Sequence, residues 1–192
     1  MADTGPSLGT WGWRTIVGHM FPMLVALSCI VLVAGITLED AEALLEEYGI
    51  LAVMVPTMIG MGGNLGAILS SRLSTRFHLG TTALDPRDRV LWANVAAILC
   101  LALSVFSLLG VGATLLGRVI GSTLPLTDLL VISLVCGLSV AVIAIVFSVG
   151  ATYAAYRLGI DPDDVTIPIV TSVVDVFGMV IFLGFSAFWL GG

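Results

Sequence analysis

The sequence predicts an all-α integral membrane protein with five transmembrane helices, which form a single domain over residues 1–192. Of its 192 residues, 58% are hydrophobic and 10% are charged, whereas a soluble domain of this length needs roughly a quarter of its residues charged. The mean hydropathy is +1.13. Five apolar runs are long enough to cross a bilayer, for which ~20 residues suffice. These runs lie at about 15–38, 49–71, 90–116, 128–155 and 165–190.

The charged residues and cysteines exclude several classes of protein. The seven basic residues are all arginine, the net charge is −6, and no basic patch alternates with aromatic residues, which argues against nucleic acid as a partner. Cys29, Cys100 and Cys136 lie inside apolar runs without CxxC spacing. They predict small packed side chains rather than disulfides or a metal site. The N-terminal residues lack the basic segment and cleavage site of a signal peptide.

The first predicted helix follows Trp11 and Trp13, which are typical of the headgroup layer. Pro22 is a candidate kink, and we expect His19 to be a packed, hydrogen-bonded residue rather than a ligand. Residues 39–47 then carry five carboxylates and no cation. We expect a solvated connector there. The alternative is a negative mouth that raises the local cation concentration.

The second predicted helix contains a cluster of small residues. Four glycines and Asn64 fall within residues 60–67, and glycine is unfavourable in an isolated helix. In a membrane such a cluster permits close helix approach, or an irregular backbone whose carbonyl oxygens face protein or water. Both interpretations are open from the sequence.

The remaining helices are separated by short polar loops. Four arginines are predicted in the loop before the third helix, which starts after the turn at Asp85-Pro86. A Gly/Ser/Thr loop at 118–125 leads to the fourth helix, which starts near Leu126 or Asp128. Residues 157–164 precede the last helix, after which no soluble domain is expected.

The distribution of arginine predicts the orientation in the membrane. One side receives only Arg118, and the acidic residues 39–47 share that side. The N-terminus is therefore expected in the cytoplasm and the C-terminus outside. The six arginines of the cytoplasmic side are Arg14, Arg72, Arg76, Arg87, Arg89 and Arg157.

Asp175 is the residue that points most directly to a function. It lies near the middle of the last apolar run, with no Lys, Arg or His within ten residues. A charge at that depth costs about 2.5–3.5 kcal/mol, and such residues commonly lie on ion or proton paths. Asp175 could be protonated, could bind a permeating cation, or could be half of an aspartyl catalytic pair. A homodimer would bring two copies of Asp175 about a two-fold axis, with a cation between them.

The residue types around Asp175 favour a hard cation. Carboxylate, amide, hydroxyl and carbonyl oxygens suit Mg²⁺, Ca²⁺ or Mn²⁺ better than zinc or copper. The candidate ligands outside the last helix are Asn64, Ser70 and Ser71. Within the last helix, polar and small residues share one face at i, i+3, i+4, i+7 and i+10, either lining a path or forming a packing stripe. They are Pro168, Thr171, Ser172, Asp175 and Gly178.

Two motifs resemble those of a known family. The first is Pro56-x6-Gly63-Asn64-Leu-Gly66 with the later run Ser70-Ser-Arg-Leu-Ser-Thr75. The second is Asp161-Pro-Asp163, followed by Pro168, Thr171 and Asp175-x2-Gly178. The first motif resembles the second membrane helix of the MgtE and solute carrier family 41 magnesium transporters. The second motif resembles the last membrane helix of the same family.

This resemblance implies a homodimeric transport domain with a pore between the subunits, lined by the second and last helices. It assigns Asp175 as the main cation site, and it assigns Gly63, Asn64, Thr171 and, less directly, Ser71 to the pore lining. Family members of the MgtE type carry Asn-Gln where Ala67 and Ile68 stand here. Their cytosolic regulatory domains are not expected in this single five-helix unit.

The leading hypothesis is therefore a channel or transporter for Mg²⁺ in the plasma membrane, with Ca²⁺, Mn²⁺ or Co²⁺ as other candidate ions. It needs the lipid bilayer and a second copy of the chain as partners, and no organic cofactor. A non-transporting membrane assembly subunit is the competing hypothesis. An enzyme is not expected, because the Gly-x-Gly-Asp context of intramembrane aspartyl hydrolases is missing around Asp175.

A second cation site is an open alternative near the start of the last helix. Asp161, Asp163 and Asp164 there have the favourable position of acidic residues at a helix N-terminus. They could also form a cytoplasmic cation-sensing site, which Asp85 and Asp88 would join.

Overall fold

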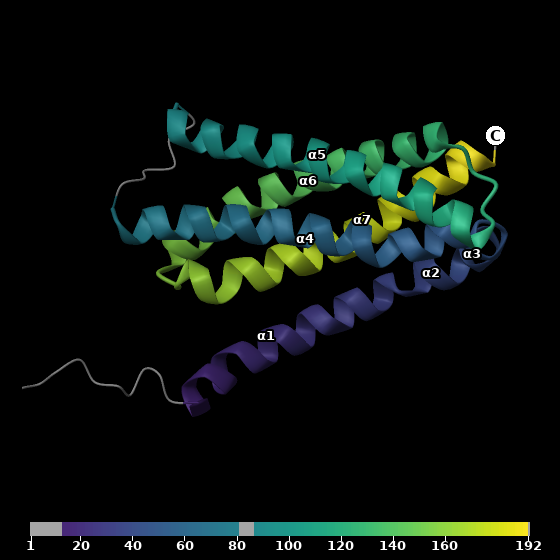
Figure 1. Cartoon of the computed structure of the whole chain (residues 1–192). Coiled ribbons are helices and arrows are strands. Elements are labelled where there is room, and N and C mark those ends of the chain that lie inside the picture. The colour runs from purple at the N-terminus through teal and green to yellow at the C-terminus, as the bar shows by residue number, and fades with distance from the viewer. Residues whose placement is uncertain (1–12, 81–86, 192) are drawn as a thin grey trace, which may run out of the picture.

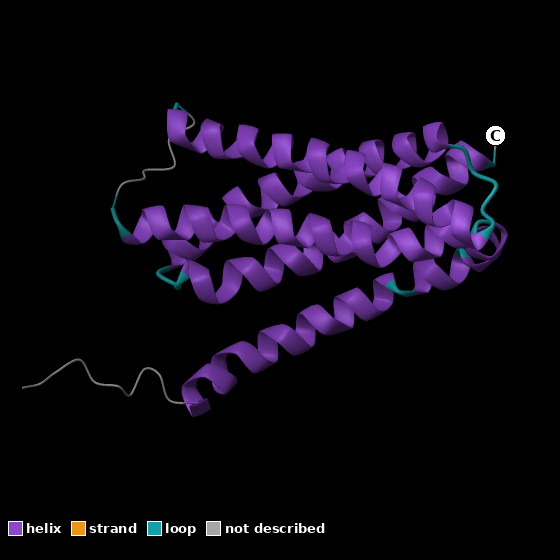
Figure 2. Ribbon diagram, in the orientation of Figure 1, coloured by secondary structure: helices purple, strands orange, loops and turns teal. Residues whose placement is uncertain are grey.

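The computed structural model describes residues 13–80 and 87–191, and these are helical apart from short turns (Figure 2). Five stretches of the described chain are long and apolar enough to cross a membrane, as the sequence predicts. They are Met20–Asp40, Gly49–His78, Arg89–Ile120, Leu126–Leu158 and Asp164–Leu190. The helices in chain order are α1 (Trp13–Ala34), α2 (Ile36–Asp40), α3 (Glu42–Glu47), α4 (Gly49–His78), α5 (Arg89–Ile120), α6 (Leu126–Leu158) and α7 (Pro162–Leu190).

Three of the long helices extend beyond their predicted ends. Helix α4 continues to His78, so Arg72 and Arg76 lie on this helix and not in the predicted loop. A helix of 30 residues is about 45 Å long, whereas the hydrocarbon core of a bilayer is about 30 Å thick. The apolar run in the sequence marks only the part of a helix that lies within the hydrocarbon layer. The predicted runs are therefore shorter than the helices of the structure. Helices α5 and α6 are each followed directly by a glycine, Gly121 and Gly159. The positive φ angles of these residues, 78° and 68°, favour glycine.

The acidic segment, for which the sequence predicts a solvated connector, is helical. It forms the short helices α2 and α3, and Leu44 and Leu45 of α3 pack against the hydrophobic core. Residues 42–47 are alanine, leucine and glutamate, which are all strong helix formers. The turn between α2 and α3 therefore lies on the bundle while its carboxylates remain exposed.

The glycine cluster brings α4 close to two other helices. Helix α4 is unbroken through residues 60–67, so the irregular-backbone interpretation is wrong. A Cβ atom on Gly62 would lie 2.9 Å from Val174 of α7 and would also collide with Val140 of α6. A Cβ on Gly66 would lie 2.5 Å from Val170 and 3.4 Å from Ala144. These two glycines permit the close approach that small residues give membrane helices.

Helices α4, α6 and α7 consequently form the centre of the bundle, with each packed against the other two. Helix α5 packs on α6 and α4. Helix α1 packs on α7 and diverges from the bundle toward its N-terminal end (Figure 1). Its side chains are largely exposed, such as Leu32 at 76% and Val33 at 65%. Pro22 lies inside α1, which is continuous.

The end of α4, the start of α5 and the end of α6 lie at one end of the bundle, here called the arginine-rich end (Figure 1). These segments carry Arg72, Arg76, Arg87, Arg89 and Arg157. Polar side-chain contacts join the helices there. Arg76 Nη1 lies 3.0 Å from Asp88 Oδ2, Arg72 Nη1 donates a hydrogen bond to Asn94 Oδ1, and His78 Nε2 lies 3.5 Å from Asp161 Oδ1. The end of α4 is thereby tied to the starts of α5 and α7.

Candidate cation site

Asp175 lies on α7 opposite the glycine cluster of α4. A Cβ atom on Gly63 would lie 4.0 Å from Asp175 Oδ1 and 3.7 Å from the Thr171 methyl carbon. The absence of a side chain at Gly63 therefore leaves the carboxylate space on the α4 side. Gly63, Thr171 and Asp175, which were separate candidates in the sequence, lie together in the fold.

Asp175 also borders a hollow between α7 and α1. This hollow has a volume of about 390 Å³ and is lined on the α7 side by Ser172 and Asp175. Its other wall is formed by α1 residues between Leu24 and Leu32, including Ser28. The sequence interpretation did not include α1 in the site. The only signal for it was a serine within an apolar run.

Thr171 has its hydroxyl hydrogen engaged within α7. Its Oγ1 atom donates to the carbonyl oxygens of Ile167 at 3.0 Å and Pro168 at 3.1 Å. The lone pairs of Oγ1 are still available to accept a hydrogen bond. Thr171 can therefore serve a hydrated cation as an acceptor for one of its water molecules.

The other predicted residues of α4 and α7 are dispersed. Asn64 and Ser71 are exposed and do not line the hollow at Asp175. Ser70 is 1% exposed, and its hydroxyl makes no hydrogen bond within the described part of the chain. Gly178 is buried against Val140 and Ile59. Gly178 is therefore a packing residue and does not share a polar face with Asp175.

The acidic residues near the arginine-rich end have different surroundings. Asp88 caps α5, with its Oδ1 accepting from the Val90 backbone N–H at 2.9 Å, and it pairs with Arg76. Asp161 faces His78, and Asp164 is exposed. Asp85 lies outside the described residues, and the side chain of Asp163 is not described.

Within the described residues, no group of three or more His, Cys, Asp or Glu side chains could hold a metal ion. Among the described residues, Asp175 is the carboxylate that lies away from the ends of the candidate membrane spans, and hydroxyl and carbonyl oxygens lie near it. This composition suits a cation that keeps most of its water shell, since Mg²⁺ dehydrates reluctantly and is bound through one or two carboxylates.

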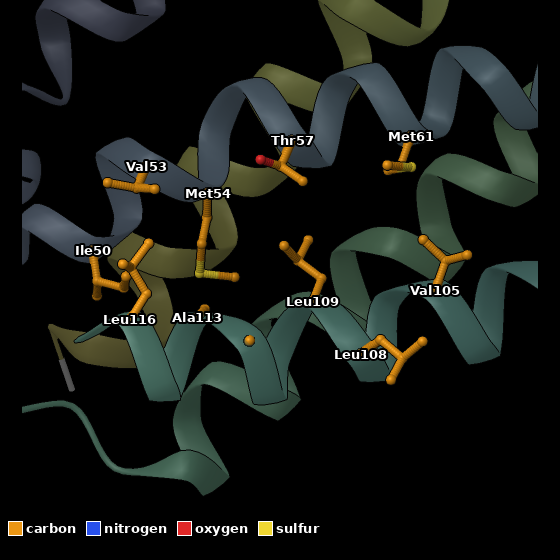
Figure 3. A pocket seen from close by; sticks show the side chains of 11 residues that line it. Ile50, Val53, Met54, Thr57, Met61, Val105, Leu108, Leu109, Ala113 and Leu116 are labelled. Carbon is orange, nitrogen blue, oxygen red and sulfur yellow. The ribbon is translucent and has the colours of Figure 1, made fainter. Parts of the chain in front are cut away.

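A second hollow lies between α4 and α5 (Figure 3). It has a volume of about 360 Å³, and Thr57 is the only lining residue with a polar side chain. In Figure 3, side chains such as Met54, Met61 and Leu109 project from the two helices into the space between them. Without charged groups or several oxygen ligands, this groove is unsuited to a cation and suited to hydrocarbon.

The chain is similar to known proteins that transport divalent cations. The family model described as MgtE, divalent cation transporter, matches residues 55–185, which include α7 through Asp175 and most of α4. The magnesium transporter MgtE of Thermus thermophilus is 35% identical over 83% of this chain and 34% of its own length. Solute carrier family 41 member 3 of Rattus norvegicus is 28% identical over 72% of this chain and 31% of its own length. The chain therefore spans about a third of the length of these relatives.

Proposed function

We propose that this chain, which belongs to the MgtE family of divalent cation transporters, moves divalent cations across a membrane, with Mg²⁺ as the principal ion. The observation that supports the proposal most directly is the position of Asp175. Its carboxylate lies within a membrane-spanning helix, next to the space left by Gly63 and at the edge of a hollow. The activity is transport without chemical conversion, and no residue is assigned a catalytic role.

The site becomes complete in a homodimer. Each chain supplies one intramembrane carboxylate, and two copies of Asp175 about a two-fold axis would neutralise a divalent ion. Two facing carboxylates without a cation would repel each other, so the ion stabilises the pair. The bound species is a hydrated ion, because Mg²⁺ keeps several waters in sites with few carboxylates.

Helices α4 and α7 line the proposed path. Gly63 provides space, and Thr171 accepts a hydrogen bond from a water of the ion. Asn64 and Ser71 are exposed on α4, where they are available to the pore or to the second copy. The same hard-oxygen chemistry would admit Ca²⁺, Mn²⁺ or Co²⁺ to a degree that competition measurements would establish.

The arginine-rich end is proposed to face the cytoplasm. The membrane that holds the protein is proposed to be the plasma membrane. Asp161, Asp163, Asp164, Asp85 and Asp88 are the candidates for a cytoplasmic cation site. A divalent ion there would compete with the contact of Asp161 with His78 and with the ion pair of Asp88 with Arg76. Such competition would loosen the contacts that tie α4 to α5 and α7.

Substitution of the carboxylate tests the proposed transport site. We expect Asp175→Asn to lower Mg²⁺ uptake into reconstituted vesicles about 10- to 100-fold, since a hydrogen bond to a charged group contributes ~1.5–3 kcal/mol and 1.4 kcal/mol is a factor of ten. The matched control is Asp128→Asn, at the first turn of α6, which should retain uptake. Undiminished uptake by Asp175→Asn would contradict the proposal.

The competing hypothesis of a non-transporting assembly subunit depends on small residues that are free to pack against a partner. Gly62 and Gly66 are already packed against α6 and α7 of the same chain, whereas Gly60 and Gly112 have nothing within 4 Å of an added Cβ and are open to a partner. A purified chain that gives no uptake with any divalent cation, while remaining folded, would favour the assembly hypothesis.

A further inference from the structure

Helix α1 contributes one polar side chain to the hollow that Asp175 faces. The α1 wall consists of four apolar residues and Ser28, and the opposite wall presents Ser172 and Asp175. Ser28 and Ser172 therefore border the same space as Asp175. The remaining exposed side chains of α1 are mainly large and apolar, such as Leu24, Val25 and Leu32.

The hollow has room for a divalent cation with its first water shell. Six waters at ~30 Å³ each occupy about 180 Å³, whereas the hollow has about 390 Å³. A bare ion would contact few oxygen atoms in a space of this size. A hydrated ion could place one water against the Asp175 carboxylate and another against a serine hydroxyl across the hollow.

Because Asp175 borders this hollow, filling the hollow with lipid tails is unfavourable. A carboxylate that borders lipid tails loses its hydration without gaining hydrogen bonds, which is costly. Water in the hollow removes that cost, and serine hydroxyls at its walls can donate to and accept from such water. Ser28 is thus placed at a wall of the proposed site, where its hydroxyl can contact solvent.

We infer that α1 forms a wall of the cation site and that Ser28 is a positioning residue, which holds one water of the hydrated cation opposite Asp175. This inference rests on the proposed transport function. It adds a third helix to a path otherwise formed by α4 and α7. It also assigns to the loosely packed α1 a role in cation affinity.

Thiol labelling tests whether the α1 wall faces water. Cys29 follows Ser28 directly, so its side chain is rotated by about 100° at nearly the same membrane depth, and both Cys29 and Cys100 are exposed. One variant carries Ser28→Cys with Cys29→Ala and Cys100→Ala. The matched control keeps Cys29 and carries only Cys100→Ala. Buried Cys136 is retained in both.

Both variants are reconstituted as full chains in phosphatidylcholine–phosphatidylglycerol vesicles and treated with a charged methanethiosulfonate reagent. We expect the thiol at position 28 to react at least tenfold faster than Cys29, and 10 mM Mg²⁺ to slow that reaction. A reaction no faster than that of Cys29 would indicate a lipid-filled hollow and overturn the inference. A fast reaction that Mg²⁺ does not slow would overturn it as well.

Uptake measurements separate this inference from the proposed function. Ser28→Ala should raise the Mg²⁺ concentration for half-maximal uptake about 3- to 10-fold with a smaller change in maximal rate, and Ser28→Thr should restore it because the hydroxyl is retained. The control Ser139→Ala removes a hydroxyl that is bonded to the Val135 carbonyl oxygen and should have no effect. If Asp175→Asn abolishes uptake while Ser28→Ala behaves as wild type, only the role of Ser28 is overturned. If Asp175→Asn has normal uptake, the proposed function itself fails.

Discussion

The α4–α6–α7 core and helix α1 represent two ways for an apolar helix to exist in a membrane. In the core, Gly62 and Gly66 of α4 lie where a side chain would collide with α6 and α7. Helix α1 is equally apolar but has mostly exposed side chains and packs on α7. Hydrophobicity alone does not drive helices together in lipid. The difference therefore arises from residue size: small residues and shape complementarity hold the core, and α1 lacks such close packing with α4 and α6.

The largest expected effect is at the glycine contacts of the core. Gly62→Leu should destabilise the protein by about 3 kcal/mol or more, because a side chain there overlaps both Val140 and Val174. Thermal unfolding in detergent would measure the loss.

Gly60→Ala is the matched control on the same helix, since nothing lies within 4 Å of the added Cβ. It should leave the unfolding midpoint unchanged or raise it, because alanine favours a helix by up to ~1 kcal/mol over glycine. Equal midpoints for Gly62→Leu and Gly60→Ala would contradict the packing role assigned to the core glycines.

A pair of leucines sharpens the comparison between the core and α1. Leu69 of α4 is 0% exposed and Leu32 of α1 is 76% exposed. Leu69→Ala should cost about 2–5 kcal/mol through the cavity it leaves, with the lower end expected in lipid. Leu32→Ala should change stability by less than ~0.5 kcal/mol. If both variants lost the same stability in chemical denaturation, α1 would be packed as tightly as the core.

The smallest expected effect concerns the ionic contacts at the arginine-rich end. The Val90 backbone N–H and then the Arg76 guanidinium hold the pKa of Asp88 below its ordinary value. A lowered pKa in the folded state means that the carboxylate stabilises the fold at neutral pH, and that this contribution is lost as the pH falls below about 4. Wild type should therefore lose more stability between pH 7 and pH 3 than Asp88→Asn.

Asp88→Asn is an informative variant because asparagine remains a good N-cap while losing the titrating charge. Unfolding midpoints measured across that pH range, at constant ionic strength, would provide the comparison. A wild-type curve parallel to that of Asp88→Asn would show that the Arg76–Asp88 pair contributes nothing to the stability of this end.

Part of the candidate site could be predicted from the sequence. Asp175 was identifiable because an unpartnered carboxylate in a long apolar run is conspicuous whatever surrounds it. Gly63 and Thr171 were candidates, and the fold places both beside Asp175. Gly178 was assigned to the polar face, yet it packs against α4 and α6, because spacing along one helix does not specify which neighbours its edges meet.

The sequence by itself determined the five spans, the accumulation of arginine at one end and the intramembrane aspartate. These are local properties, since apolar length, charge and residue type need no knowledge of distant contacts. Only the tertiary structure decided which glycines pack against neighbouring helices, that the acidic segment is helical and rests on the bundle, and that Ser28 borders the same hollow as Asp175. Ser28 and Asp175 are far apart in the chain, and their proximity depends on how α1 is rotated and seated against α7. In lipid that arrangement is set by side-chain shape, which a pattern of apolar residues does not encode.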